Sequence, residues 1–169
     1  MTLSIVGTSD LHGAIDRLPI LAGYVANLRA ARAADGGAVI LVDGGDMFQG
    51  TLESNLNEGQ AVIAAYNVMG YQAAAVGNHE FDFGPEGPKV VADAPGEDPR
   101  GALKKRATEA RFPLLTANVL DKATGKRVDW APASTVVEAA GVKVGILGAS
   151  TESTPYTTMP ANFVGLEML

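Results

Sequence analysis

The chain has 169 residues, of which 47% are hydrophobic, and its formal net charge is −6. This length suits one domain with a substantial core, and the acidic balance disfavours a nucleic-acid polymer as partner, because binding a phosphate backbone depends on clustered Lys and Arg. The chain contains no cysteine, so a metal ion would be bound through oxygen and nitrogen atoms. No apolar stretch approaches the roughly 20 residues of a membrane-spanning helix.

The first half of the chain alternates between predicted strands and predicted helices. Apolar residues at 3–6 predict a buried strand, and residues 19–34 place apolar side chains at helical spacing. The near-continuous apolar run at 38–42 predicts a second strand that is covered on both faces. A helix at 60–69 and a third strand at 73–76 follow. This order predicts a mainly parallel sheet with helices on both faces and a ligand site at the carboxyl ends of the strands.

The second half of the chain is less regular. An insertion at 85–101, rich in Pro, Gly, Asp and Glu, is expected to form an irregular surface loop. A helix at 103–111 and a short strand at 113–118 are predicted next, and residues 134–139 and 142–147 have the pattern of a β-hairpin. After the hairpin the sequence loses its periodicity, so no further element is predicted.

Three short polar segments, at residues 8–13, 43–51 and 77–84, follow the predicted strands. In the first, Asp10 and His12 are separated by one residue, so in an extended segment both side chains would point the same way and could bind one cation. An isolated Asp-x-His pair is also common in ordinary surface loops and caps. The pair therefore indicates a metal site only in combination with the other two segments.

These other segments add the remaining polar groups of a metal site. Asp46 follows two glycines that permit a sharp turn, and it is either a metal ligand or the cap of a turn or helix. Asn78 offers a neutral carbonyl oxygen to a metal ion among carboxylates. Adjacent side chains point apart, which would leave His79 free to face a substrate as a proton donor. Asp82 lies within reach of the His79 ring across a turn, where it would fix the tautomer and stabilise the imidazolium.

The three segments resemble the site loops of calcineurin-like metallophosphoesterases, most closely those of the 5′-nucleotidase branch. The resemblance lies in SDLHG at 9–13, DGGDMFQGT at 43–51 and GNHEFDFG at 77–84, with TANV at 116–119 matching a later turn. It implies an α/β fold with a mainly parallel sheet flanked by helices. Residues 1–169 would form a single truncated domain, an incomplete half of the family's four-layer α/β/β/α sandwich.

The resemblance also implies two divalent metal ions, such as Mn²⁺ or Zn²⁺, and a role for each site residue. The implied metal ligands are Asp10, His12, Asp46 and Asn78. His79 and Asp82 would form an acid dyad that stabilises the transition state and protonates the leaving group. The implied reaction is in-line attack on phosphorus by a hydroxide generated on the metal pair, and the implied substrate is a small phosphate ester of the nucleotide type.

Three residues within the segments are expected to support the site from behind. Asp43 would cap or hydrogen-bond behind the ligands, and Gln49 would hold its turn. Glu80 is expected to be structural, because its neighbours point it away from the metal ions.

The chain departs from the family pattern after the third segment. The family completes its site with later histidines, one isolated and two in a Gly-His-x-His turn, whereas this chain has no histidine after His79. We therefore expect the carboxy-terminal part of the protein to lie outside this sequence. Three hypotheses stay open: a phosphoester hydrolase with half its active site here, an isolated fragment that binds metal weakly through Asp10, His12 and Asp46 without activity, and a related sulfur-ester hydrolase with the same dimetal core.

The branch is commonly exported in bacteria, so the resemblance suggests a periplasmic or secreted protein. Residues 1–4, by contrast, lack the basic flank and apolar region of a signal peptide. The sequence thus does not fix the localisation.

Overall fold

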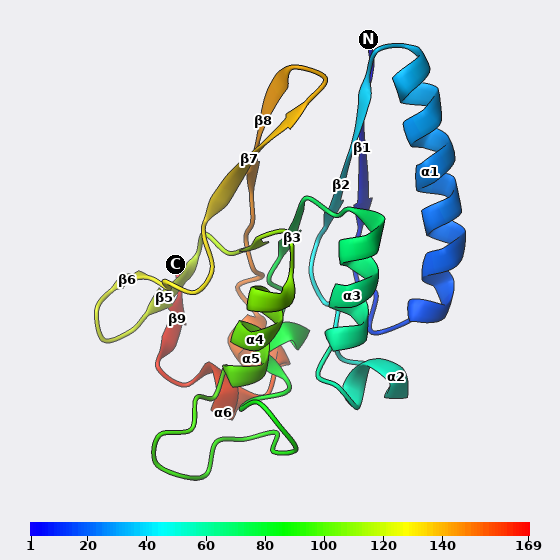
Figure 1. Ribbon diagram of the computed structural model, residues 1–169. Coiled ribbons are helices and arrows are strands. Elements are labelled where there is room, and N and C mark those ends of the chain that lie inside the picture. Colours follow the sequence, from blue (N-terminus) through cyan, green and yellow to red (C-terminus); the bar gives the residue numbers. More distant parts are fainter.

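A four-stranded parallel sheet in the order β1-β2-β3-β4 forms the frame of the computed structural model, which describes residues 1–169 (Figure 1). The strands are β1 (Leu3–Thr8), β2 (Ala38–Asp43), β3 (Ala73–Ala75) and β4 (Leu114–Leu115). Each strand pairs in parallel with the next one along the chain. The predicted α/β fold with a parallel sheet flanked by helices is therefore confirmed.

Three longer helices connect these strands: α1 (Leu18–Ala34), α3 (Gln60–Met69) and α4 (Gly101–Glu109). The prediction of α3 agrees with the structure at both ends, whereas α4 begins earlier than predicted, so the irregular insertion ends at residue 100. The helix α3 ends at Gly70, which adopts the left-handed conformation that favours glycine. No helix has both the length and the apolar character that crossing a membrane requires.

All three helices pack on the same face of the sheet. Alternate strand residues point to this face and share one buried cluster with the helices, which includes Leu41, Ala74, Leu114, Val25, Ile63, Tyr66 and Leu103. Successive parallel strands that follow one direction, joined by right-handed crossovers, place every crossover helix on the same side. The expectation of helices on both faces is therefore wrong, although the sheet is flanked by helices as predicted.

The other face of the sheet faces a β-hairpin instead. The hairpin consists of β7 (Ser134–Ala139) and β8 (Val142–Leu147), and β7 contacts β2. The chain after β8 lies directly on β4, since a Cβ atom at Gly148 would come within 2.4 Å of the Leu115 side chain. This cover is partial, because Ile40 of β2 is 1% exposed while its neighbour in register, Ile5 of β1, is 67% exposed.

The remaining elements are short. A second, antiparallel sheet has the order β6-β5-β9 and consists of β6 (Lys126–Arg127), β5 (Val119–Asp121) and β9 (Leu166–Met168). The short helices are α2 (Leu52–Asn55), α5 (Thr154–Thr157) and α6 (Pro160–Phe163), with 3-10 turns η1 (Ile15–Arg17) and η2 (His79–Phe81). The prediction of no further element after the hairpin is therefore wrong, because α5, α6 and β9 follow it. Elements of three or four residues show no measurable periodicity.

Candidate metal centre

The candidate site lies where β1, β2 and β3 end, in the three polar segments that follow them. Beyond β1 and β2 the two chains stay side by side: the N–H of Asp10 donates to the Gly45 carbonyl at 3.0 Å, and the N–H of His12 donates to the Asp46 carbonyl at 3.0 Å. The third segment reaches the second through the His79 N–H, which donates to Asp46 Oδ1 at 2.9 Å. Backbone hydrogen bonds thus bring together residues that are far apart in the sequence.

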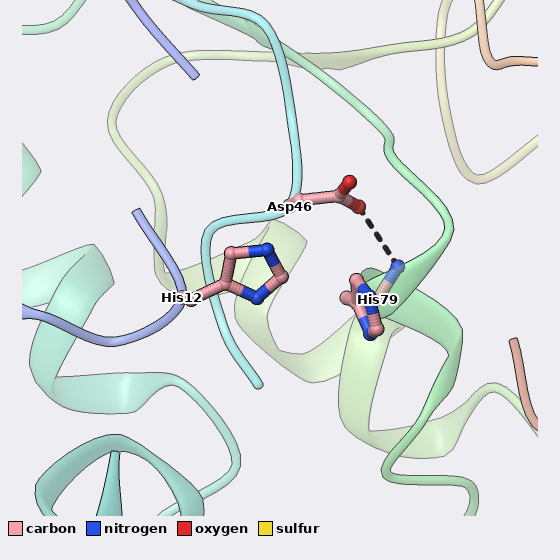
Figure 2. Close-up of side chains that lie close together, drawn as sticks. All are labelled: His12, Asp46 and His79. Carbon is pink, nitrogen blue, oxygen red and sulfur yellow. Dashed lines mark hydrogen bonds between the residues drawn. The ribbon is translucent and has the colours of Figure 1, made fainter. Parts of the chain in front are cut away.

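Three potential ligands meet at this junction: His12, Asp46 and His79 (Figure 2). One ligand atom from each lies within 4.8 Å of the other two, and all three side chains are half-buried. The His12 and His79 rings meet edge to face, with centroids 4.8 Å apart and planes at 68°. An imidazole pair with a carboxylate is a donor set that first-row divalent metal ions accept.

The backbone around these ligands adopts conformations that are uncommon for residues with a side chain. Only five residues other than glycine have positive φ, and three of them are Asp10 (φ 53°), His12 (φ 49°) and Asp46 (φ 58°). Such strain clusters at functional sites, and Asp and His tolerate it better than most residues. The expected extended geometry between Asp10 and His12 is therefore wrong, because the chain turns at both residues.

Two glycines allow the second and third segments to approach each other. A Cβ atom at Gly77 would come within 2.3 Å of Asp46 Oδ1, and one at Gly45, where φ is +102°, would come within 2.7 Å of the Gly77 nitrogen. Neither approach leaves room for a side chain. The turn predicted for the glycines before Asp46 is thus also a contact with the next segment.

Hydrogen bonds fix which ring nitrogen of His12 faces the site. Its Nδ1 lies 2.8 Å from the Gln49 carbonyl oxygen. A carbonyl only accepts, so Nδ1 carries the proton and Nε2 has its lone pair free for a cation. Gln49 acts here through its backbone carbonyl, which orients the His12 ring.

The buried carboxylate of Glu80 connects the second and third segments. Its carboxylate accepts the N–H groups of Asp46 at 2.9 Å, Met47 at 2.7 Å and Gly77 at 2.7 Å. The side chain is completely buried, and burial raises its pKa to about 7. These contacts agree with the structural role expected for Glu80.

Asp43 lies one layer deeper, at the end of β2. It is 4% exposed and accepts hydrogen bonds from the Thr8 hydroxyl, the Gly45 N–H at 2.7 Å and the Tyr66 hydroxyl at 2.8 Å. Burial raises its pKa above the ordinary value, and these donors act against that rise. Asp43 therefore anchors the turn that leads to the candidate ligand Asp46 through the hydrogen bonds expected of it.

His79 and Asp82 lie together as the sequence suggested. His79 Nδ1 is 2.6 Å from Asp82 Oδ2, across the turn η2. An ionised carboxylate only accepts, so Nδ1 carries the proton and Nε2 is free on the side of His12 and Asp46. The other oxygen of Asp82 accepts hydrogen bonds from Thr158 and Met159, two residues that sequence reasoning missed.

Known proteins resemble this chain over nearly its whole length, although no protein-family model matches it. It is 31% identical to Protein UshA of Escherichia coli strain K12 over 174 residues, which cover 98% of this chain and 28% of the relative. It is 33% identical to the 5′-nucleotidase of Vibrio cholerae serotype O1 over 172 residues, with the same coverage of 98% and 28%. The solved structure of a 5′-nucleotidase precursor from Thermus thermophilus matches with a TM-score of 0.71 at 28% identity, covering 100% of this chain and 32% of that one.

The chain is homologous to the amino-terminal part of 5′-nucleotidases. The resemblance stated from the three polar segments is therefore confirmed. The chain spans only 28% of the length of the first two relatives. The similarity alone therefore does not assign the activity of a complete relative to this chain.

The structure unites some of the predicted site residues and leaves others apart. The predicted ligands His12 and Asp46 lie in the cluster, which also includes His79, predicted as the acid rather than as a ligand. Asp10 is exposed and is not a member of the cluster. Asn78 lies next to His79 in the chain, and its amide nitrogen donates to the Thr157 carbonyl at 3.0 Å, which leaves its oxygen free.

Proposed function

We propose that this chain forms part of a metal-dependent phosphoester hydrolase of the 5′-nucleotidase type. The observation that carries the proposal is the cluster of His12, Asp46 and His79 at the carboxyl ends of three parallel strands. Ligand sites in open α/β sheets lie at this edge. The homology to 5′-nucleotidases supports hydrolysis of a phosphate ester as the chemistry.

The donor set fits a divalent cation. His12 Nε2 is unprotonated and unpaired, and Asp46 uses only Oδ1 in a hydrogen bond, to the His79 N–H. Asn78 has a free carbonyl oxygen beside them. We propose that His12, Asp46, Asn78 and Asp10 hold two divalent ions in the complete protein. When bound, such ions lower the pKa of water and stabilise charge on a phosphate.

His79 and Asp82 are proposed as the acid dyad. Asp82 accepts a hydrogen bond from the Nδ1–H group of His79, so the ring presents Nε2 toward the cluster. At that position Nε2 can exchange a proton with a leaving group. The same carboxylate holds the ring in place across the turn η2. The position of the leaving group would therefore be on the Nε2 side of His79.

A cavity beside the dyad has room for the organic part of a small ester. Its volume is about 590 Å³, and Gln49, Asp82, Phe83 and Met159 are among its lining residues. Pockets for small ligands span roughly 300–1,000 Å³. A nucleotide monoester is the proposed substrate class, and the negative charge of the chain would be offset by the bound cations.

The division between ligand and acid is tested by two alanine variants in the longest available form of the protein. Asp46→Ala should lose bound metal and turnover together, because it removes a carboxylate from the cation site. His79→Ala should keep the metal and lower turnover by about 100-fold or more. Asp129→Ala, which removes an exposed carboxylate elsewhere, is the matched control.

Metal content by mass spectrometry, intact mass and hydrolysis of a generic phosphate monoester with Mn²⁺ are the measurements. Equal metal loss in both variants would show that His79 is a ligand and not the acid. A protein of 17.4 kDa with less than one metal per chain and no turnover would favour the inert fragment. Two metals without turnover on phosphate esters, but with turnover on a sulfur ester, would favour the third hypothesis.

A further inference from the structure

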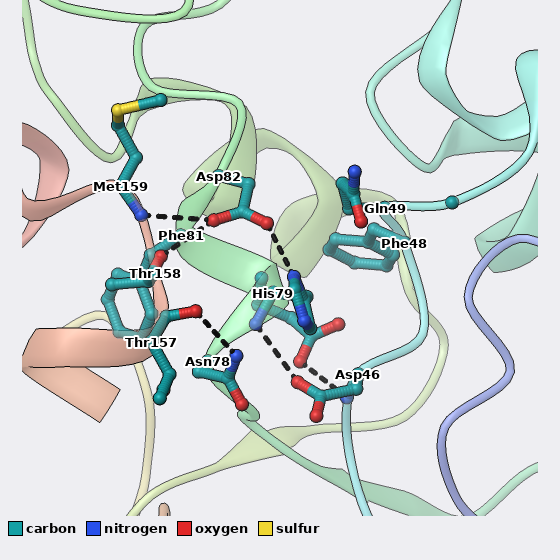
Figure 3. A network of polar contacts seen from close by, with 12 residues as sticks. Asp46, Phe48, Gln49, Asn78, His79, Phe81, Asp82, Thr157, Thr158 and Met159 are labelled. Atoms are coloured by element: carbon teal, nitrogen blue, oxygen red, sulfur yellow. Dashed lines mark hydrogen bonds and ion pairs between the residues drawn. The ribbon is translucent and has the colours of Figure 1, made fainter. Parts of the chain in front are cut away.

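A segment from the far end of the chain, residues 157–159, lies against the candidate dyad (Figure 3). The Thr158 hydroxyl donates to Asp82 Oδ1 at 2.9 Å, and the Met159 N–H donates to the same oxygen at 3.1 Å. The carbonyl of Thr157 accepts the Asn78 amide N–H at 3.0 Å. One segment thus contacts both the predicted ligand Asn78 and the predicted dyad.

The two oxygens of Asp82 have separate partners. Oδ2 accepts from the His79 ring, and Oδ1 accepts from the segment. A carboxylate that is held at both ends cannot turn about its bond to Cβ, so its direction toward the ring is fixed. Thr158 is 8% exposed, which protects this hydrogen bond from competition by water.

The segment itself is anchored. The N–H of Thr158 donates to the Thr154 carbonyl at 3.2 Å, and the Thr154 hydroxyl donates to the Thr151 carbonyl at 2.7 Å. On the other side, the Asn162 amide N–H group donates to the Phe81 carbonyl at 2.8 Å. Because both flanks are held, the Thr158 hydroxyl has a defined position before any substrate arrives.

We propose that Thr158 is a positioning residue that holds Asp82 and thereby keeps the His79 ring in its Nδ1–H tautomer. An effect of Thr158 on catalysis depends on the acid role proposed for His79. Without the hydroxyl, Asp82 Oδ1 keeps only the Met159 N–H, and the carboxylate can turn away from the ring. A fraction of neutral His79 would then carry its proton on Nε2, and the ring would lose the Asp82 contact that directs Nε2 toward the cluster.

The chain permits a direct test, because it contains only two histidines, His12 and His79. Long-range proton–nitrogen NMR at alkaline pH, where both rings are neutral, reports the tautomer of each ring in the metal-free chain. His12→Gln assigns the two sets of signals. We expect His79 of the unaltered chain to be the Nδ1–H tautomer and Thr158→Val to convert a measurable fraction to Nε2–H.

Two controls separate positioning from a general loss of structure. Thr158→Ser keeps the hydroxyl and should restore the Nδ1–H tautomer. Thr108→Val removes another threonine hydroxyl, which donates only to the Lys105 carbonyl on an exposed part of α4, and should leave His79 unchanged. If Thr158→Val does not fold, the unaltered chain still decides, since an Nε2–H tautomer of its His79 would overturn the proposal.

Turnover in the longest form of the protein then distinguishes the two proposals. We expect Thr158→Val to lower kcat about tenfold with KM unchanged and Thr158→Ser to recover it. A changed tautomer with an unchanged kcat would support the positioning role and contradict the acid role of His79. An unchanged tautomer in folded Thr158→Val would overturn the positioning role, whatever the activity.

Discussion

At Glu80 the chain buries a carboxyl group that binds three backbone N–H groups, those of Asp46, Met47 and Gly77. Burial is the largest cause of its raised pKa, to about 7 from 4.5, and the hydrogen bonds act in the opposite direction. A group whose pKa is higher in the folded state than in the unfolded chain binds protons more tightly when folded. Stability from this group is therefore complete below pH 4.5 and is lost as the pH rises through 7.

This gives a pH-dependence that one substitution removes. The metal-free protein should lose about 3 kcal/mol of unfolding free energy between pH 4.5 and pH 8 through Glu80, whereas Glu80→Gln, which cannot titrate, should lack this contribution. Urea unfolding with EDTA at several pH values measures how the unfolding free energy of the unaltered chain and of Glu80→Gln changes with pH. Glu138→Gln, which alters an exposed glutamate, is the control. Parallel pH profiles for the chain with and without Glu80→Gln would contradict the expectation.

Several residues of the site could be identified from residue type and order alone. The Gly-Asn-His-Glu run and the Asp-x-His pair predicted the candidate ligands and the candidate dyad, and His79 Nδ1 lies 2.6 Å from Asp82 Oδ2, the contact that the proposed dyad needs. The reason given for Asp10 and His12 was wrong, because their positive φ values replace an extended segment with a turn. Thr158 had no signal, since its partner lies 76 residues away and a single Thr in a Thr-rich stretch carries no pattern.

At the scale of the elements, a residue of α1 caps the carboxyl end of α3. The Arg29 guanidinium of α1 donates to the Met69 carbonyl at 2.7 Å and to the Gly70 carbonyl at 3.2 Å. The last carbonyls of a helix have no partner within the helix, and a cation there also interacts favourably with the helix dipole. The sequence predicted the end of α3 from Gly70 but not this second contact, because a long-range cap leaves no local pattern.

Arg29→Met should destabilise the chain by about 1 kcal/mol, because it keeps most of the apolar stem and removes the hydrogen bonds and charge. Arg17→Met is the matched control, since Arg17 has its side chain 80% exposed and pairs only with the adjacent Asp16. Denaturant unfolding measures both variants. A loss as large for Arg17→Met as for Arg29→Met would show that the cap adds nothing beyond surface charge.

Across the whole molecule, the sheet has two unlike faces. One is buried under α1, α3 and α4, and the other is only partly covered by the hairpin of β7 and β8. Strand alternation and helix spacing predicted the strands of the parallel sheet, the three longer helices and the hairpin, but neither tells which face a crossover takes. The face that the crossover helices cover follows from the order of the strands in the sheet, and the sequence pattern does not predict this order.

The uneven cover predicts different costs for two neighbouring isoleucines on that face. Ile40→Ala should cost about 3 kcal/mol of unfolding free energy, because Ile40 is 1% exposed and its removal leaves a cavity. Ile5→Ala should cost less than about 1 kcal/mol, because Ile5 is 67% exposed. Urea unfolding of both variants at one pH compares them directly. Similar losses would mean that β1 is covered on this face in solution.

The position of the 157–159 segment has a consequence for the time at which the site forms during synthesis. All the ligands predicted within this chain, and both residues of the proposed dyad, have left the ribosome once Asp82 has emerged. The groups that hold Asn78 and Asp82 follow only with Thr157, Thr158 and Met159. A nascent chain would therefore carry the predicted ligands well before their geometry is fixed, and tight binding of metal ions at the proposed site should come late in translation.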